Sequence, residues 1–150
     1  AYEISACLVG SEMCKETYYV QALTWTPDVT IASLICGLLI DTLLVVNNYR
    51  DREADARSGK RTVIVRFGEK FGRYFYLMLG ITASLLCLCF LREGHFYAAF
   101  LPQLYLIPHF LTWKRMVKIY SGKKLNSILG ETSRNMLLMG ILIAIGMLIN

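Results

Sequence analysis

Three residues in the middle of the chain could bind a metal ion together. Asn47, Asp51 and Asp55 stand at positions i, i+4 and i+8, so a helix would place all three on one face. Two carboxylates at this spacing repel each other by roughly a few tenths of a kcal/mol, and a cation between them would relieve the repulsion. Mg²⁺ suits oxygen ligands beside a phosphorylated substrate. The spacing therefore predicts a magnesium site at Asn47, Asp51 and Asp55.

Basic residues follow this acidic face directly and could bind a diphosphate. Arg57, Lys60 and Arg61 come within six residues of Asp55. A metal ion neutralises charge on a leaving diphosphate, while fixed cations hold its outer oxygens. The expected diphosphate ligands are therefore Arg57, Lys60 and Arg61. The expected catalytic residues are Asp51, Asp55 and Lys60. The spacing alone also fits a solvated helix end held by salt bridges.

A further carboxylate lies within the apolar run that precedes this motif. Asp41 falls seven residues before Asn48 and fourteen before Asp55, so a continuous helix would place these three side chains on one face. A carboxylate within a membrane span is costly and usually marks a functional site. The pattern predicts a polar stripe that leads from inside the membrane to its surface. A buried Asp41 that only hydrogen-bonds a neighbouring helix is the alternative.

The elements that must position these residues are transmembrane helices. The chain has 150 residues, of which 55% are hydrophobic and 18% charged, whereas soluble domains carry about 25% charge. Four apolar stretches approach the roughly 20 residues of a membrane crossing; they are residues 29–46, 74–91, 96–113 and 135–149. We therefore expect an all-α integral membrane protein with about four transmembrane helices over residues 29–150. Residues 1–28 are expected to be the end of a preceding helix or irregular.

Basic residues concentrate in two loops and predict the orientation. Of the 16 Lys and Arg residues, eight fall within residues 50–73 and six within 114–134, whereas the link at 92–95 is neutral with His uncharged. Two expected spans separate the basic loops, so both lie on one side, which the positive-inside rule makes cytoplasmic. The net charge of +5 is thereby explained by topology and gives no support to nucleic-acid binding.

The motif as a whole resembles a known family signature. It reads Asn47-Asn48-x-Arg50-Asp51-x-x-x-Asp55, then Gly59-Lys60-x-Thr62 and Arg66-x-Gly68, and it is similar to the second aspartate-rich motif of the UbiA superfamily of intramembrane prenyltransferases. The resemblance covers about residue 17 to residue 150. It implies the C-terminal part of a bundle of nine transmembrane helices around a central cavity. It also implies Mg²⁺ at Asp51 and Asp55 with support from Asn47, and a diphosphate that faces Lys60 and Arg61.

The paired asparagines and the Gly-Lys-x-Thr block favour one branch of that superfamily. The resemblance to this branch implies transfer of a polyprenyl group from polyprenyl diphosphate to 1,4-dihydroxy-2-naphthoate. The product is demethylmenaquinone, made for menaquinone biosynthesis at the bacterial inner (cytoplasmic) membrane. The family's first aspartate motif is absent from this sequence. We therefore expect the missing N-terminal half of the same fold as a partner, and no activity from this chain alone.

Three other interpretations stay open. The first is a UbiA-type enzyme with another aromatic acceptor. The second is a non-catalytic four-span membrane protein, such as a cation-binding transporter fragment; a transporter should show paired broken helices or an inverted repeat, and the sequence has neither. The third is a truncated, inert gene product.

Aromatic side chains and one histidine could add to the chemistry. Tyr49 and the aromatic residues of 96–113 could stabilise a carbocation by cation–π attraction, although aromatic residues in spans more often pack or face lipid. His109 could accept a proton from the aromatic substrate, with a packed neutral histidine as the alternative. Pro102 and Pro108 are expected to kink the span that contains them.

Overall fold

The described part of the chain contains only helices and their connections. The computed structural model describes residues 2–24, 26–122 and 124–149, with side chains from Ser11 onward. The elements in chain order are α1 (Tyr2–Ala22), α2 (Pro27–Arg57), α3 (Val63–Phe67), α4 (Glu69–Leu86), the 3₁₀ helix η1 (Cys87–Glu93), α5 (Phe96–Phe100), the 3₁₀ helix η2 (Leu101–Tyr105), α6 (Leu106–Ile119) and α7 (Leu125–Ile149). The predicted all-α class is confirmed. The stretch expected to be a helix end or irregular contains the helix α1.

Helix α2 is the longest element and carries the predicted site. It begins after Thr26, whose backbone is extended, with Pro27 in the first turn, where the missing N–H of proline costs nothing. It runs for 31 residues to Arg57, or about 46 Å at about 1.5 Å per residue. A hydrocarbon core is about 30 Å thick, so the last turns of α2 would extend beyond it. Gly59, at φ +76°, turns the chain away after the helix ends.

Within the described residues, three helical segments are long and apolar enough to cross a membrane: Pro27–Arg57, Glu69–Glu93 and Leu125–Ile149. They contain three of the four predicted spans. The last of them, α7, begins ten residues before the predicted stretch at 135–149 and is 25 residues long. The prediction underestimated its length because the first turns of α7 are polar.

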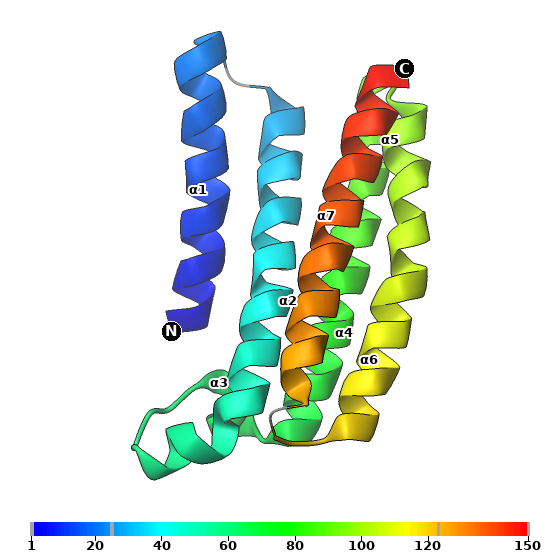
Figure 1. The fold of residues 1–150 in the computed structure, drawn as a ribbon. Coiled ribbons are helices and arrows are strands. Elements are labelled where there is room, and N and C mark those ends of the chain that lie inside the picture. Colours follow the sequence, from blue (N-terminus) through cyan, green and yellow to red (C-terminus); the bar gives the residue numbers. More distant parts are fainter. Residues whose placement is uncertain (1, 25, 123, 150) are drawn as a thin grey trace.

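The predicted span at 96–113 is helical throughout but is not one regular α-helix, as the expected kink at Pro102 implies. It is divided among α5, η2 and α6, which have 5, 5 and 14 residues. The change to 3₁₀ geometry coincides with Pro102, which lacks an N–H and clashes with the preceding turn of an α-helix. Gln103 contributes to the polar contacts there, because its Nε2 donates to the carbonyl of Ala99 at 3.0 Å. Figure 1 shows α5 and α6 as one column beside α7.

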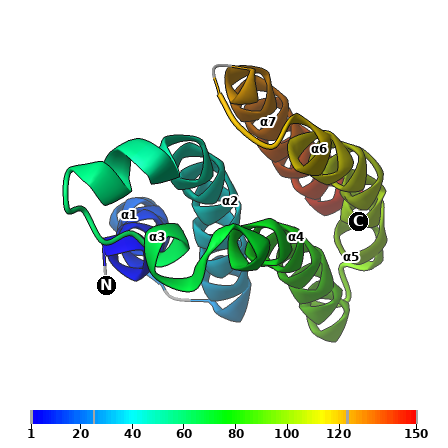
Figure 2. The ribbon, with the colours of Figure 1, turned by 90° about the horizontal axis from the view of Figure 1, so that it is seen from below.

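The helices alternate in direction, so both basic stretches lie at one end of the bundle. Figure 1 shows the end of α2, α3 and the link from α6 to α7 together at the bottom, and the link from η1 to α5 at the top. Viewed from below in Figure 2, the helices form an open curve from α1 to α7. This arrangement agrees with the predicted placement of residues 50–73 and 114–134 on one side.

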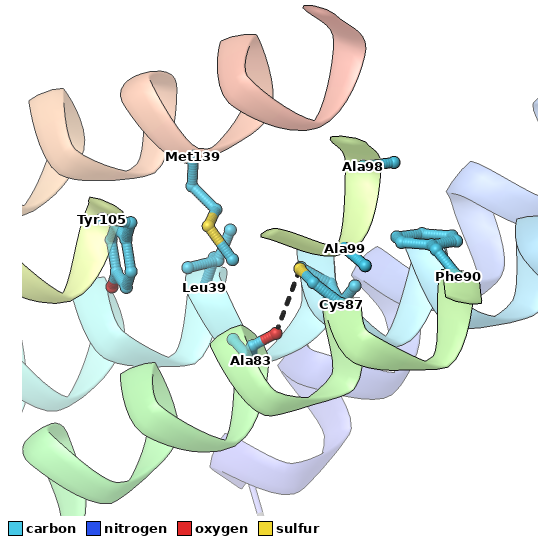
Figure 3. Close-up of a cluster of buried hydrophobic side chains, with 9 residues drawn as sticks. Leu39, Ala83, Cys87, Phe90, Ala98, Ala99, Tyr105 and Met139 are labelled. Atoms are coloured by element: carbon cyan, nitrogen blue, oxygen red, sulfur yellow. Dashed lines mark hydrogen bonds between the residues drawn. The ribbon is translucent and has the colours of Figure 1, made fainter. Parts of the chain in front are cut away.

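Two buried apolar clusters hold the helices together. The first joins Leu39 of α2 and Met139 of α7 to Ala83, Cys87 and the small residues of α5. Figure 3 shows these side chains converging, with the Cys87 thiol donating to the carbonyl of Ala83 at 3.5 Å. The second cluster lies nearer the basic loops and includes Tyr49 of α2, beside the predicted site. The polar end of α2 is therefore anchored by packing.

Candidate functional site

The polar end of α2 brings the predicted metal ligands to one helical face. Asn47, Asp51 and Asp55 all lie within the continuous helix Pro27–Arg57. Asp51 is paired with its neighbour Arg50, whose Nε and Nη2 donate to Oδ1 and Oδ2 at 2.7 and 2.6 Å. Asp51 lies beyond the apolar stretch 29–46, and hydrogen bonding to the Arg50 guanidinium lowers the pKa of its carboxyl. In this structure the positive charge beside Asp51 is that of the Arg50 guanidinium.

Among the described residues, Asp55 has an ion-pair partner on one oxygen only. Lys60 Nζ lies 3.6 Å from Asp55 Oδ1, and the Lys60 N–H donates to the Asp55 carbonyl at 2.9 Å. The turn at Ser58 and Gly59 thus returns Lys60 to the acidic face. Asp55 Oδ2 is buried without a hydrogen-bond partner among the described residues. A buried carboxylate oxygen of this kind is costly unless a ligand satisfies it.

The other two predicted diphosphate ligands are not brought to the aspartates. Arg57 Nε donates to the carbonyl of Glu53 at 3.2 Å. Arg61 lines a separate hollow of about 370 Å³ beside α3. Within the described part of the chain, neither guanidinium forms an ion pair with a carboxylate of the motif. Lys60 is therefore the basic residue of the predicted set that contacts the acidic face.

An apolar groove adjoins this polar face. It has a volume of about 460 Å³ and lies between α2 and α7, and its lining includes Leu43, Leu44, Leu129 and Asn47. Asn47 is at once a wall of the groove and a hydrogen-bond partner of Arg50 Nη2, at 2.8 Å. The site thus combines an apolar groove with a charged end.

The predicted polar stripe is turned into the protein. Asp41 is 8% exposed and Asn48 is 4% exposed, and the Asp55 side chain is 13% exposed. These three residues share a face of α2, as their spacing predicted. The functional interpretation of Asp41 stays a prediction.

Tyr49 does not face the site. Its ring is fully buried, with the Arg52 and Arg73 guanidinium groups 4.6 and 5.9 Å from its centroid. Arg73 Nε also donates to the Tyr49 hydroxyl at 2.9 Å. The Tyr49 ring thus contacts two arginines, one from α2 and one from α4. These contacts favour a packing role for Tyr49 over stabilisation of a carbocation.

His109 is a packed core histidine in this structure. It is buried between the rings of Tyr76 and Tyr105, at centroid distances of 4.7 and 5.1 Å. The Tyr105 hydroxyl lies 2.9 Å from His109 Nδ1. These contacts satisfy a buried imidazole without a substrate.

Comparison with known proteins identifies the chain's relatives. The sequence profile of the UbiA prenyltransferase family matches residues 5–148. The chain belongs to the UbiA prenyltransferase family. It is 32% identical over 137 residues to a 1,4-dihydroxy-2-naphthoate octaprenyltransferase of Haemophilus influenzae, covering 89% of this chain and 44% of that protein. It is 39% identical over 72 residues to the protein of that name in Escherichia coli, covering 48% of this chain and 23% of that protein.

A eukaryotic relative belongs to the same family. A UbiA prenyltransferase domain-containing protein 1 of Dictyostelium discoideum is 29% identical over 143 residues, which is 95% of this chain and 41% of that protein. This UbiA-family chain thus spans less than half the length of the curated relatives it matches. No solved structure matches it.

The donors at the polar end of α2 fit the Mg²⁺ that this family implies. No group of three or more His, Cys, Asp or Glu side chains gathers for a metal in the described parts of the chain. The α2 face offers instead two carboxylates and the Asn47 amide, all hard oxygen donors. Mg²⁺ is commonly held by one or two carboxylates, with substrate phosphates and water as its other ligands. The buried Asp55 Oδ2 is such a donor.

Sequence reasoning missed a polar network between α6 and α7. Arg115 Nη1 donates to Glu131 Oε1 at 2.7 Å, Thr112 Oγ1 to Glu131 Oε2 at 3.3 Å, and Asn135 Nδ2 to Thr112 Oγ1 at 3.0 Å. In the sequence, Arg115 is one of the six basic residues of the stretch 114–134 from which the orientation is predicted. The pair Glu131 and Asn135 at i, i+4 was the signal that could have revealed a polar face on this UbiA-family helix.

Proposed function

We propose that this chain forms the C-terminal part of an intramembrane prenyltransferase. The reaction transfers a polyprenyl group from polyprenyl diphosphate to 1,4-dihydroxy-2-naphthoate, with loss of carbon dioxide and diphosphate, and gives the hydroquinone demethylmenaquinol, which is isolated as demethylmenaquinone after oxidation by air. The observation that carries the proposal is the apolar groove between α2 and α7 with Asn47 in its wall, beside Asp51. Family membership supports it, as do two relatives named 1,4-dihydroxy-2-naphthoate octaprenyltransferase.

Each part of the site has a role in this proposal. Asp51 and Asp55 hold Mg²⁺ with support from Asn47, and the ion supplies electrostatic stabilisation of the departing diphosphate. Lys60 binds a diphosphate oxygen, and Arg57 and Arg61 complete the basic surface around it. The Lys60 side chain is 61% exposed, so it is free to move from Asp55 to a ligand. The groove holds the apolar chain and keeps water from the reacting carbon.

The proposed setting is the bacterial cytoplasmic membrane. The basic loops 50–73 and 114–134 face the cytoplasm, which gives a soluble diphosphate headgroup access to Lys60. Residues 96–113 cross the membrane as the column of α5, η2 and α6. The first aspartate motif, in the N-terminal half of a nine-helix fold, completes the cavity and the clamp around the diphosphate.

A non-catalytic membrane protein is the second candidate. Arg50 and Lys60 already pair with the two aspartates, and such pairs also occur as structural contacts at helix ends. In that case the acidic face would bind no diphosphate and take no part in prenyl transfer, although it could bind a cation.

The test compares this chain alone with the chain co-expressed with an N-terminal half that carries the first aspartate motif. Purified preparations receive a polyprenyl diphosphate, Mg²⁺ and, in parallel, 1,4-dihydroxy-2-naphthoate, 4-hydroxybenzoate or homogentisate. We expect demethylmenaquinone from the paired halves above an Asp51→Asn control, and none from the chain alone. Product from another acceptor only would replace the proposed substrate, and a pair that uses no acceptor would support the non-catalytic candidate.

A further inference from the structure

One guanidinium occupies the oxygen atoms that the proposed metal site needs. Arg50 bonds both carboxylate oxygens of Asp51, at 2.7 and 2.6 Å, and its Nη2 also donates to Asn47 Oδ1 at 2.8 Å. Bidentate pairs of Arg with a carboxylate are among the strongest hydrogen-bonded contacts in proteins. Two of the three proposed metal ligands are therefore engaged by Arg50.

The same guanidinium links two helices that are far apart in the sequence. Arg50 Nη1 donates to Asn126 Oδ1 at 3.0 Å, in the first turn of α7. The groove lies between α2 and α7, and Asn47 forms part of its wall. Arg50 thus connects the two walls of the groove beside the acidic face.

Arg50 and a divalent cation would compete for these oxygens. Mg²⁺ binds its ligands at about 2.0–2.1 Å in near-octahedral geometry. A guanidinium held within hydrogen-bond distance of the same oxygens would stand directly beside that ion with like charge, and the two would repel each other. The Arg50 guanidinium and the metal ion therefore cannot occupy these oxygens at the same time.

We propose that Arg50 occupies the Asn47 and Asp51 oxygens in the metal-free state and is displaced when a divalent cation binds. The proposal rests on the proposed metal site. Displacement releases the bond to Asn126, so cation binding and the α2–α7 link oppose each other. By thermodynamic linkage, anything that weakens the Arg50 contacts strengthens cation binding.

The first test measures Mn²⁺ binding to the purified full chain by electron paramagnetic resonance, without substrate. We expect Arg50→Gln to raise Mn²⁺ affinity at least about tenfold, since charge-assisted hydrogen bonds are lost only from the metal-free state. Arg50→Lys keeps the charge but not the bidentate contact. The Mn²⁺ affinity of Arg50→Lys should therefore fall between those of the wild type and Arg50→Gln. Asn126→Ala removes one anchor of Arg50 without touching a metal ligand and should raise affinity by a smaller factor.

The matched control is Arg57→Gln, which removes the same charge from the same helix. Arg57 contacts only the Glu53 carbonyl among the described residues. An equal gain in affinity in Arg57→Gln and Arg50→Gln would overturn the proposal, because net charge would then explain both. An unchanged affinity in Arg50→Gln, with binding still lost in Asp51→Asn, would overturn the role of Arg50 and leave the metal site intact. Absence of saturable Mn²⁺ binding in every variant would overturn both.

The second test follows the link between the helices. Ala54 of α2 and Ser127 of α7 are both exposed. In a variant without other cysteines, Ala54→Cys and Ser127→Cys carry spin labels, and double electron–electron resonance measures the distance between them. We expect Mg²⁺ to shift or broaden the distance distribution, with no change in Asp51→Asn. In Arg50→Gln the distribution should already be altered without Mg²⁺. Identical distributions in all samples would contradict the proposed coupling.

Discussion

Gly80 of α4 lies directly against the imidazole of His109 of α6. A Cβ built on Gly80 would clash with His109 Nε2. The imidazole cannot retreat along its ring normal, because Tyr76 and Tyr105 stack on it. The absence of a side chain at Gly80 therefore sets how closely α4 and α6 approach.

This contact predicts a measurable cost for Gly80→Ala. Overpacking a tight core typically destabilises a protein by about 1–3 kcal/mol, so the variant should unfold at lower temperature in detergent. Gly140→Ala is the matched control, because a Cβ at Gly140 meets nothing within 4 Å. In a His109→Ala background the penalty of Gly80→Ala should largely disappear, as a double-mutant cycle would show. Equal melting of Gly80→Ala and Gly140→Ala would contradict the packing account.

The acidic face predicts a large effect on catalysis. In the enzyme completed by its N-terminal half, Asp51→Asn or Asp55→Asn should lower turnover by at least about a hundredfold, the scale of losing one electrostatic stabiliser. Radiolabelled prenyl transfer measures this. Glu53→Gln is the control, because Glu53 lies on the same helix but its side chain is 70% exposed. Near-normal prenyl transfer in both aspartate variants would contradict the assignment of Asp51 and Asp55 as metal ligands.

The groove predicts a dependence on prenyl chain length. Gly130 lines it, and a Cβ there meets nothing within 4 Å, so Gly130→Phe fills the groove without a backbone clash. Turnover with a long polyprenyl diphosphate should fall at least about tenfold, because the added ring occupies the space of several methylenes. Dimethylallyl diphosphate should be affected much less. The control Gly140→Phe should behave like the wild type; an equal loss with both diphosphates in Gly130→Phe would argue against a chain-binding groove.

The charge distribution predicts the orientation in the membrane. In a cysteine-free background, Ser58→Cys and Ser121→Cys should react with an impermeant maleimide in sealed inverted vesicles, because both lie in basic loops. Glu93→Cys, in the opposite link, should react only from the other face. Reaction of Ser58→Cys from that other face would exclude access of a cytosolic diphosphate to Lys60.

Local periodicity was enough to predict the face of α2 that carries the site. Asn47, Asp51 and Asp55 share that face because an α-helix repeats every 3.6 residues, and the helix continues through all three. Hydropathy likewise predicted four spans, three of which lie in long apolar helices of the described chain, since a membrane crossing demands a minimum apolar length. The motif pointed to the family that the profile match confirms.

Side-chain partners were decided only by the tertiary structure. The sequence motif contains Arg50 but does not predict its partner. In the structure Arg50 donates a hydrogen bond to Asn126, 76 positions away. Tyr49 was a candidate for the site until packing placed its ring between Arg52 and Arg73. Helical spacing follows from local backbone geometry, so the sequence alone determines it. A partner depends on which distant segments pack together, and so the arrangement of Arg50, Asn126 and the groove required the folded chain.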